Sequence, residues 1–258
     1  MKKLSKQSQN EVNEWLIKNS ENLTIKEINE YLEQHFGYRL HHNYPSIFRR
    51  LGIHYKKCDR KYNFKENIFE KIDTKEAAWL LGLFISDGCL RETNGTVKWF
   101  QKDLQLVETI RNVLYANNKI EEVIRENRCY YQIILSSRKM CNDLINLNFF
   151  DYKSHDVKIP VISENLEWHL IRGIHDGDGS NFITSRGALC CAFAGTFDVL
   201  NFIKRKANVT AKIIPDKRTK FSHTFRIQGK QAVDFLTKMY VDSENLRLER
   251  KFRVFNNS

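Results

Sequence analysis

The chain has 258 residues, of which 41% are hydrophobic and 12% aromatic, which is enough for a packed core and for more than one domain. Lys and Arg number 42 against 31 Asp and Glu, so the formal net charge is +11 and a polyanion such as nucleic acid is the expected partner. There is no apolar signal segment at the N-terminus, and the longest apolar run, residues 77–85, is too short to cross a bilayer. We therefore expect an intracellular, cytoplasmic protein with no membrane partner.

The first 55 residues predict a small all-α domain. Apolar residues at helical spacing indicate three helices, over residues 10–19, 24–36 and 45–51. Thr24 followed by Glu27 predicts a capping box at the start of the second helix, and Gly37 predicts its C-cap. The same spacing turns the apolar side chains of the third helix inward and leaves its two arginines outward, as suits a helix that enters a DNA major groove.

The stretch 23–57 resembles the helix-turn-helix of transposase-like DNA-binding modules, chiefly through segments 27–32, 36–37, 46–52 and 55–57. The DNA-binding candidates in the third helix, the turn before it and the residues after it are Asn43, Ser46, Arg49, Arg50, Lys56 and Lys57. Small three-helix units also serve as protein-docking domains, so that alternative stays open. Residues 56–72 then form a basic segment with aromatic side chains between the charges, which predicts either a solvated linker or one that follows a DNA backbone.

From residue 73 on, the chain repeats itself. Residues 80–88 and 171–179 each combine an apolar helical stretch, small residues four apart and a terminal Asp-Gly. After the first motif we expect strands over 96–101, near Val123 and over 130–135, with helices over 104–114 and 139–147. After the second we expect strands near 181–184 and over 188–194, 211–214 and 224–227, with helices over 197–207, 231–240 and, at the end, 243–252. The predicted fold is α+β, with two αββαββα repeats over 73–164 and 165–258.

The small residues of the motifs predict how the two motif helices meet. They are Gly82, Ser86, Gly173 and Gly177. Residues four apart stack on one helix face, so two such helices can pack closely and bring Asp87 and Asp178 together. Two carboxylates about 4 Å apart repel by roughly 4 kcal/mol at an effective dielectric near 20, and a divalent cation removes that repulsion. Gly88 and Gly179, which follow the carboxylates, are expected to turn the chain sharply and to complete the metal site.

These paired motifs resemble those of LAGLIDADG homing endonucleases, and the resemblance covers about residues 73–255. It implies a monomer whose two sheets form a saddle on double-stranded DNA, with Asp87 and Asp178 as the metal-binding acids. It also implies polar and basic residues around the metals, for which the candidates by position are Gln101, Arg138, Lys139 and Lys230. Two departures stand out. The sixth motif position is Ile85 in the first copy against Asp176 in the second, and Gly195 stands at the place that matches Gln101.

We therefore predict a site-specific double-strand DNA endonuclease that hydrolyses phosphodiester bonds with Mg²⁺, or alternatively Mn²⁺, on a long target. A DNA-binding regulator that keeps the fold without the chemistry remains an alternative. Gly195 and the added helix-turn-helix allow it, whereas the retained pair Asp87 and Asp178 argues against it. An intron maturase that binds structured RNA is the third possibility.

Overall fold

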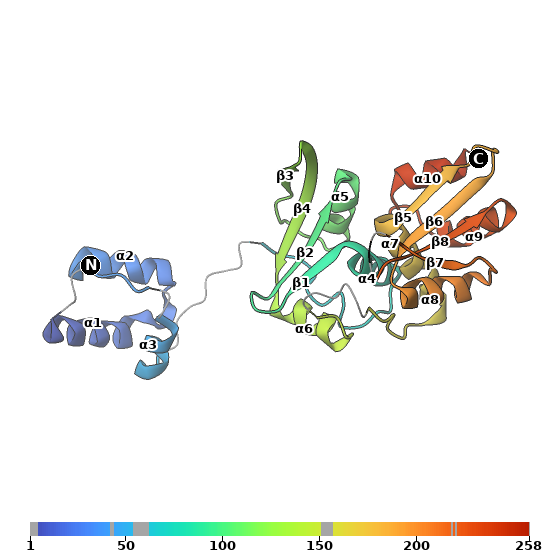
Figure 1. Ribbon diagram of the computed structural model, residues 1–258. Helices are drawn as coiled ribbons and strands as arrows, with labels where there is room; N and C mark the ends of the chain where they lie inside the picture. Colours follow the sequence, from blue (N-terminus) through green and yellow to red (C-terminus); the bar gives the residue numbers. More distant parts are fainter. Residues whose placement is uncertain are drawn as a thin grey trace. The chain divides into compact units, whose positions relative to one another are not determined.

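The structure, a computed structural model, describes residues 5–41, 44–53, 62–150, 157–217, 219 and 221–257. The chain forms two compact units, Met1–Lys61 and Tyr62–Ser258. The described residues of the first form helices and no strands, and the second unit holds two sheets on either side of a central helix pair (Figure 1). Among the described residues, no helix is long and apolar enough to cross a membrane.

The N-terminal unit contains the three predicted helices. They are α1 (Lys6–Asn19), α2 (Ile25–Phe36) and α3 (Tyr44–Leu51), with a short 3-10 helix η1 (Ser20–Asn22) after α1. Helix α1 begins earlier than expected because the Ser5 side chain accepts a hydrogen bond from the Ser8 amide. The predicted capping box of Thr24 and Glu27 is present, and Gly37 ends α2 at a φ of 58°. The buried apolar core consists of Val12, Leu16, Ile28, Leu32, Leu40 and Phe48.

The first half of the second unit alternates helices with strand pairs. Its elements are α4 (Lys75–Asp87), β1 (Gly88–Arg91), β2 (Thr96–Gln101), α5 (Leu104–Val113), β3 (Glu121–Arg125), β4 (Arg128–Ser136) and α6 (Arg138–Asn146). The strands form an antiparallel sheet in the order β1-β2-β4-β3. Residues 62–72, predicted as part of a linker, pack against this half, where Ile68 and Phe69 are buried in its core.

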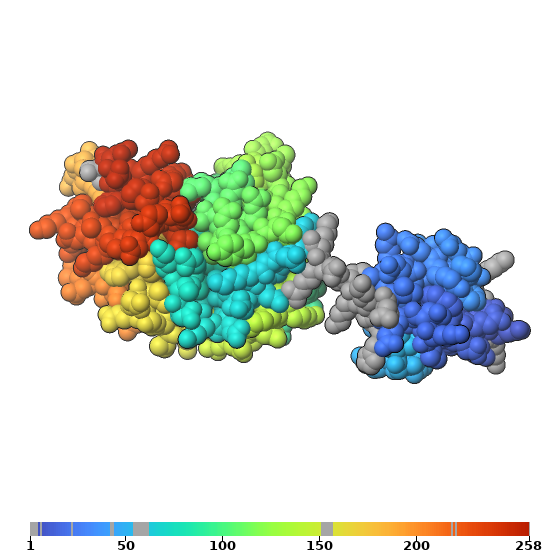
Figure 2. All heavy atoms as spheres, turned by 180° about the vertical axis from the view of Figure 1, so that it is seen from behind, coloured from blue at the N-terminus to red at the C-terminus, as the bar shows by residue number. Residues whose placement is uncertain are grey.

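The second half repeats this order. Its elements are η2 (Glu164–Leu166), α7 (Glu167–Asp178), β5 (Gly179–Ile183), β6 (Leu189–Gly195), α8 (Phe197–Ala207), β7 (Ile213–Pro215), β8 (His223–Gln228), α9 (Lys230–Tyr240) and α10 (Glu249–Asn256). The sheet is again antiparallel, in the order β5-β6-β8-β7. The predicted α+β fold of two αββαββα repeats is therefore confirmed. Figure 2 shows the two repeats, cyan to green and yellow to red, in direct contact.

Two elements differ from the sequence prediction. Strand β1 was not predicted, because it has only four residues and depends on pairing with β2, where Gly88 lies opposite Trp99. The last helix, expected over 243–252, begins only at Glu249. The segment before it is held in another conformation, since Leu246 is buried and its carbonyl accepts a hydrogen bond from Arg172 Nε at 2.7 Å.

Candidate functional site

The motif helices α4 and α7 cross with their backbones in contact, as the glycine spacing predicted. A methyl group added at Gly82 would overlap the Leu170 carbonyl oxygen, and one added at Gly173 would overlap the Trp79 carbonyl oxygen. Contact this close requires residues without a side chain, which explains glycine inside a helix at a cost of about 1 kcal/mol each relative to alanine. The crossing fixes how the C-terminal ends of the two helices lie relative to one another.

The two motif carboxylates stand at these ends. Asp87 is the last residue of α4 and is partly buried, whereas Asp178 is the last residue of α7 and is exposed. A methyl group at Gly177 would overlap Asp87 Oδ2 and the Ser86 hydroxyl, so the Asp87 carboxylate lies against the residue that precedes Asp178. The structure thus brings the two predicted acids to one place.

Gly88 and Gly179 stand where the chain turns out of each motif helix, as predicted, but without a left-handed conformation. Their φ values are −74° and −91°, which any residue can adopt, so neither makes a left-handed turn. A side chain is excluded instead by space, because an added methyl would overlap Phe84 at the first position and His175 at the second. Both glycines let a strand start directly under the helix that ends before it.

The donors at this place suit a hard divalent cation. Two carboxylates at helix C-termini, with main-chain carbonyls beside them, are oxygen ligands of the kind that Mg²⁺ prefers. The described part of the chain contains no group of three or more His, Cys, Asp or Glu side chains that could hold a metal ion. A cation bound by Asp87 and Asp178 would therefore complete its shell with carbonyls, water or substrate oxygens. The residues present therefore fit a Mg²⁺ ion that takes the rest of its ligands from carbonyls, water or substrate.

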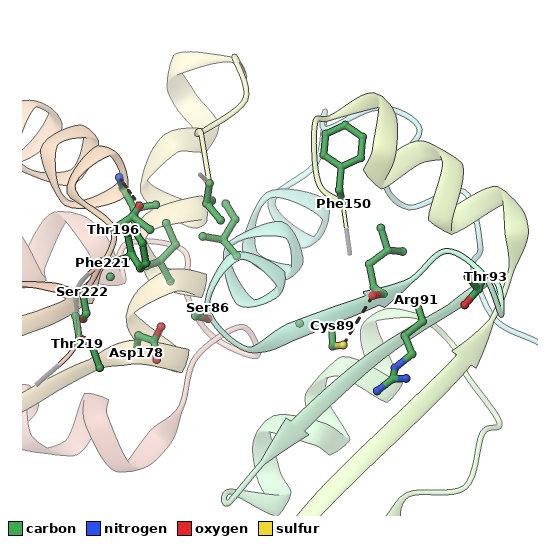
Figure 3. A pocket seen from close by; sticks show the side chains of 18 residues that line it. Ser86, Cys89, Arg91, Thr93, Phe150, Asp178, Thr196, Thr219, Phe221 and Ser222 are labelled. Atoms are coloured by element: carbon green, nitrogen blue, oxygen red, sulfur yellow. Dashed lines mark hydrogen bonds between the residues drawn. The ribbon is translucent and has the colours of Figure 1, made fainter. Parts of the chain in front are cut away.

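A hollow of about 800 Å³ opens beside Asp178 (Figure 3). It lies between the repeats, with Ser86, Cys89 and Arg91 on one side and Thr196 and Ser222 on the other. Ala194 and Gly195 also line it, so the exposed carboxylate of the second motif has open space next to it.

Strand register gives Gln101 and Gly195 equivalent places. Gly88, after the first motif, pairs with Trp99, and Gly179, after the second, pairs with Phe193. Gln101 and Gly195 each lie two residues further along their strands, on the side of the motif aspartates. The predicted correspondence between them therefore holds in the fold, and the second repeat has no side chain at this place.

The structure does not bring the predicted basic residues Arg138, Lys139 and Lys230 to the carboxylates. Helices α6 and α9 follow the ends of β4 and β8 that are remote from Gln101 and Gly195. Arg138 donates to the Glu92 and Thr93 carbonyls at 2.8 and 3.0 Å. Lys139 pairs with Glu70 at 2.7 Å and Asp143 at 3.3 Å, and Lys230 is exposed at the start of α9. The start of the last helix of each repeat therefore lies at the end of the sheet that is remote from the carboxylates, so the prediction of these basic residues by position is wrong.

One protein-family model matches most of the first repeat. Residues 74–142, which run from the start of α4 into α6, match the family model described as a LAGLIDADG-like domain. This segment is similar to LAGLIDADG-like domains. No curated protein sequence matches the chain.

Several solved structures are similar to the chain. Full-length DUF199/WhiA from Thermatoga maritima is 16% identical with a TM-score of 0.48, over 76% of this chain and 66% of that one, so the match spans just under two thirds of WhiA. The homing endonuclease I-WcaI, bound to its DNA recognition sequence, is 11% identical with a TM-score of 0.49, over 72% and 87%. I-DmoI, in complex with DNA and Ca, is 18% identical with a TM-score of 0.46, over 70% and 94%.

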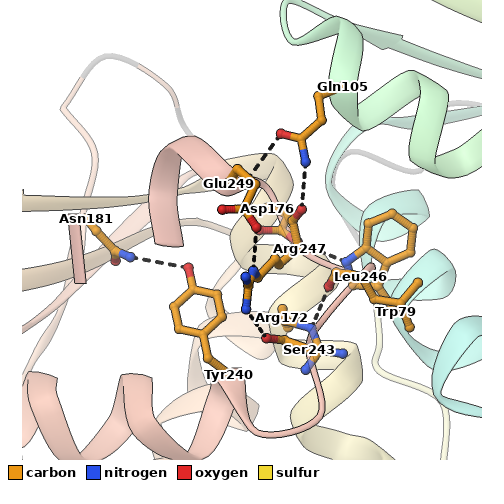
Figure 4. A network of polar contacts seen from close by, with 10 residues as sticks. All are labelled: Trp79, Gln105, Arg172, Asp176, Asn181, Tyr240, Ser243, Leu246, Arg247 and Glu249. Carbon is orange, nitrogen blue, oxygen red and sulfur yellow. Dashed lines mark hydrogen bonds and ion pairs between the residues drawn. The ribbon is translucent and has the colours of Figure 1, made fainter. Parts of the chain in front are cut away.

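The sixth motif position links the first repeat to the second. Asp176 is buried, and its Oδ2 accepts a hydrogen bond from Trp79 Nε1 of α4 at 2.9 Å (Figure 4). Burial raises the pKa of Asp176 to about 6, against the lowering effects of the Trp79 hydrogen bond and the Lys251 charge. Ile85, at the matching position of the first repeat, is 8% exposed and apolar. Asp176 thus holds the helix pair together instead of facing the hollow.

Lys251, on α10, is a residue that the sequence did not reveal. It is 4% exposed, and its ammonium donates to the carbonyl oxygens of His175, Asp176 and Gly177 at 2.6, 2.8 and 3.1 Å. Carbonyls at the end of a helix lack intrahelical partners and carry the negative end of its dipole. Lys251 satisfies three of them directly before Asp178. Its only sequence signal is a lysine within an apolar helical pattern, which normally indicates a surface residue.

Lys251→Met is expected to destabilise the protein by about 3 kcal/mol, because three buried carbonyls lose a charged donor. Chemical denaturation measures this loss. Arg250→Met on the same helix removes only a partly exposed pair with Asp103 at 2.8 Å and is expected to cost less than about 1 kcal/mol. Equal stability of the two variants would contradict the capping role.

The difference in stability between the wild type and Lys251→Met should depend on pH. Burial lowers the pKa of Lys251 to about 8 from 10.5, so between these values the folded protein binds fewer protons than the unfolded chain. Stability from this group is therefore fully present above pH 10.5 and is lost as pH falls toward 8. The stability difference between the wild type and Lys251→Met should widen from pH 8 to 10.5.

The outer face of the first sheet is aromatic and basic. Phe100 and Tyr130 stack with ring centroids 4.9 Å apart, and Arg125 lies 4.7 Å from the Phe100 ring. Lys98 and Lys102 lie within 6 Å of these rings. The alternate residues of β2 are buried, so this cluster faces away from the helices.

The corresponding face of the second sheet carries mainly small side chains. They are Ser180, Ala192, Ala194 and Thr224, with Arg226 beside them and the larger apolar Phe182 and Ile214 on the same face. The two faces are therefore unequal in charge, although the strands that form them follow the same order.

The DNA-binding candidates of the N-terminal unit are only partly described. Ser46, Arg49 and Arg50 are exposed on α3, while Phe48 on the opposite side is 1% exposed. Asn43, Lys56 and Lys57 lie outside the described residues. The predicted outward face of this helix is confirmed for the three residues that can be placed.

Proposed function

We propose that this protein is a site-specific double-strand DNA endonuclease that hydrolyses phosphodiester bonds with a divalent cation. The observation that carries the proposal is the glycine-mediated crossing of α4 and α7, which sets the Asp87 carboxylate against Gly177 and next to Asp178. Two acids on matched helix ends, one from each repeat, suit the cutting of two antiparallel strands.

Each repeat then has a defined task. Asp87 and Asp178 hold the cation, which when bound polarises the scissile phosphate and lowers the pKa of a water. Gln101 hydrogen-bonds water or phosphate in the first repeat. The Phe100 and Tyr130 pair with its surrounding cations binds the DNA backbone and bases, since cations supply salt-dependent affinity and rings pack on base edges or methyl groups.

A cleavage selection tests this function. The full chain is incubated with a library of random duplexes in Mg²⁺, and cut molecules are sequenced. We expect one long target to be recovered, and no product in chelator. Specific binding without nicking in Mg²⁺ or Mn²⁺ would contradict nuclease activity.

The second candidate is a DNA-binding regulator without chemistry. Gly195 favours it, because the second repeat has no side chain at the place of Gln101. In that case the selected duplex would be bound equally with and without chelator. Competition by structured intron RNA for the same protein would point instead to a maturase.

We further propose that the N-terminal unit is a helix-turn-helix module that contacts the same DNA through α3. Arg49→Ala with Arg50→Ala should lower affinity about tenfold or more and reduce the slope of log affinity against log salt by about 2, because each phosphate contact contributes about 1. Binding titrations from 50 to 300 mM salt measure this. Lys26→Ala is the control, since Lys26 is exposed on α2 and pairs with Glu30. Equal slopes for all three proteins would exclude α3 from the interface.

A further inference from the structure

Two buried polar atoms stand without a hydrogen-bond partner at corresponding ends of the two sheets. They are Gln101 Nε2 in the first repeat and His223 Nδ1 in the second, as judged within the described residues. An unsatisfied buried polar group costs about 1–3 kcal/mol, so each such atom calls for an explanation, such as a water, a ligand or a role in the reaction.

Strand register relates the two side chains. Gln101 on β2 lies opposite Tyr131 on β4, and Gly195, its equivalent on β6, lies opposite His223 on β8. Residues directly opposite each other project from the same face of a sheet. Neighbouring strands are about 4.8 Å apart, so the polar side chain has moved by one strand between the repeats.

The space around Gly195 is open. A methyl group added there would come no closer than 3.8 Å to Val199 or Leu200, so nothing in the packing requires glycine. Gly195 lines the hollow together with Asp178 and with Ser222, the residue before His223. His223 packs its ring edge-on against Phe197 at 5.7 Å, which holds the imidazole from one side.

We infer that His223 supplies in the second repeat the polar group that Gln101 supplies in the first, by hydrogen-bonding the water or phosphate oxygen next to Asp178. This inference rests on the proposed endonuclease function. It accounts for Gly195, because a side chain from β8 replaces the one that β6 lacks. The two repeats then each contribute one acid and one polar neighbour.

The test follows each DNA strand separately, on the duplex obtained from the cleavage selection and labelled at both 5′ ends. His223→Phe keeps a ring against Phe197 but removes both nitrogens. Cutting of one strand should fall about 100-fold, as for loss of one donor to a reacting oxygen, with the other strand little changed. Gln101→Leu should give the opposite strand bias. Adding Gly195→Gln to His223→Phe should restore most of the lost rate.

Thermal melting and DNA binding in chelator accompany these rates. In His223→Phe the melting temperature should not fall, because an unsatisfied buried nitrogen is removed, and binding should not change. A purely structural role would lower the melting temperature and slow both strands alike, and it would not respond to Gly195→Gln. Unchanged strand bias in His223→Phe, or no rescue by Gly195→Gln, would overturn the inference while leaving the endonuclease intact. Failure of the wild type to cut any duplex would instead overturn the proposed function.

Discussion

Asp87→Asn and Asp178→Asn should each abolish double-strand cutting while DNA binding persists. Asparagine keeps the shape of the side chain but removes the charge that attracts a divalent cation. The cation contributes several kcal/mol to the transition state, and about 4 kcal/mol corresponds to about 1,000-fold in rate. Each variant should therefore cut at least about 1,000-fold more slowly, and neither should bind DNA less tightly, since a negative charge has been removed.

Cleavage rates and binding in chelator are measured on the same selected duplex. Asp234→Asn is the matched control, because Asp234 is exposed on α9 and belongs to neither motif. It should cut at the wild-type rate. If either motif variant still cuts normally, that aspartate is not a metal ligand.

Gly173→Ala should destabilise the C-terminal unit by about 3 kcal/mol or more. The new methyl group would overlap the Trp79 carbonyl oxygen, which belongs to the helix backbone and cannot rotate away as a side chain would. The helices must then separate, and the shared apolar core around them loses contact. Overpacking of this kind costs about 1–3 kcal/mol where side chains can adjust, and more where they cannot. In a unit of this size the melting temperature should fall by about 10 °C.

Gly195→Ala is the matched control for stability. Its methyl group would meet only Val199 and Leu200 at ordinary contact distance, so a change within about 0.5 kcal/mol is expected. Calorimetry or denaturant titration compares the two variants. Similar melting temperatures would show that the helix crossing tolerates a wider spacing.

The sequence was sufficient to predict the fold and the helix crossing because both depend on local, periodic signals. The spacing of Gly82 from Ser86 and of Gly173 from Gly177 indicated one small face per helix, and the structure places these faces in contact. The repeat order likewise follows from alternating patterns that each element carries in its own residues. The four-residue strand β1 carries no such pattern and was missed.

The surroundings of the carboxylates could not be predicted, because they depend on which end of a strand meets which helix. Arg138 and Lys230 are the first residues of α6 and α9, but both helices start at the ends of the sheets that are remote from the carboxylates. Lys251 reaches α7 from 73 residues downstream of Asp178, and only the folded chain reveals that its ammonium meets three carbonyls. His223 becomes a candidate only through its pairing with Gly195.

The crossing of α4 and α7 also determines how substitutions in it combine. Gly82 and Gly173 face each other across the helix crossing, and a methyl group at Gly82 would lie 2.9 Å from Gly173 Cα. Once one alanine has forced the helices apart, room already exists for the second. The two substitutions should therefore be strongly non-additive, with the double variant less destabilised than the sum of the single ones. If a larger residue became fixed at one glycine during evolution, the constraint on the other glycine would be relaxed. We therefore expect Gly82 and Gly173 to change together, although they belong to different repeats.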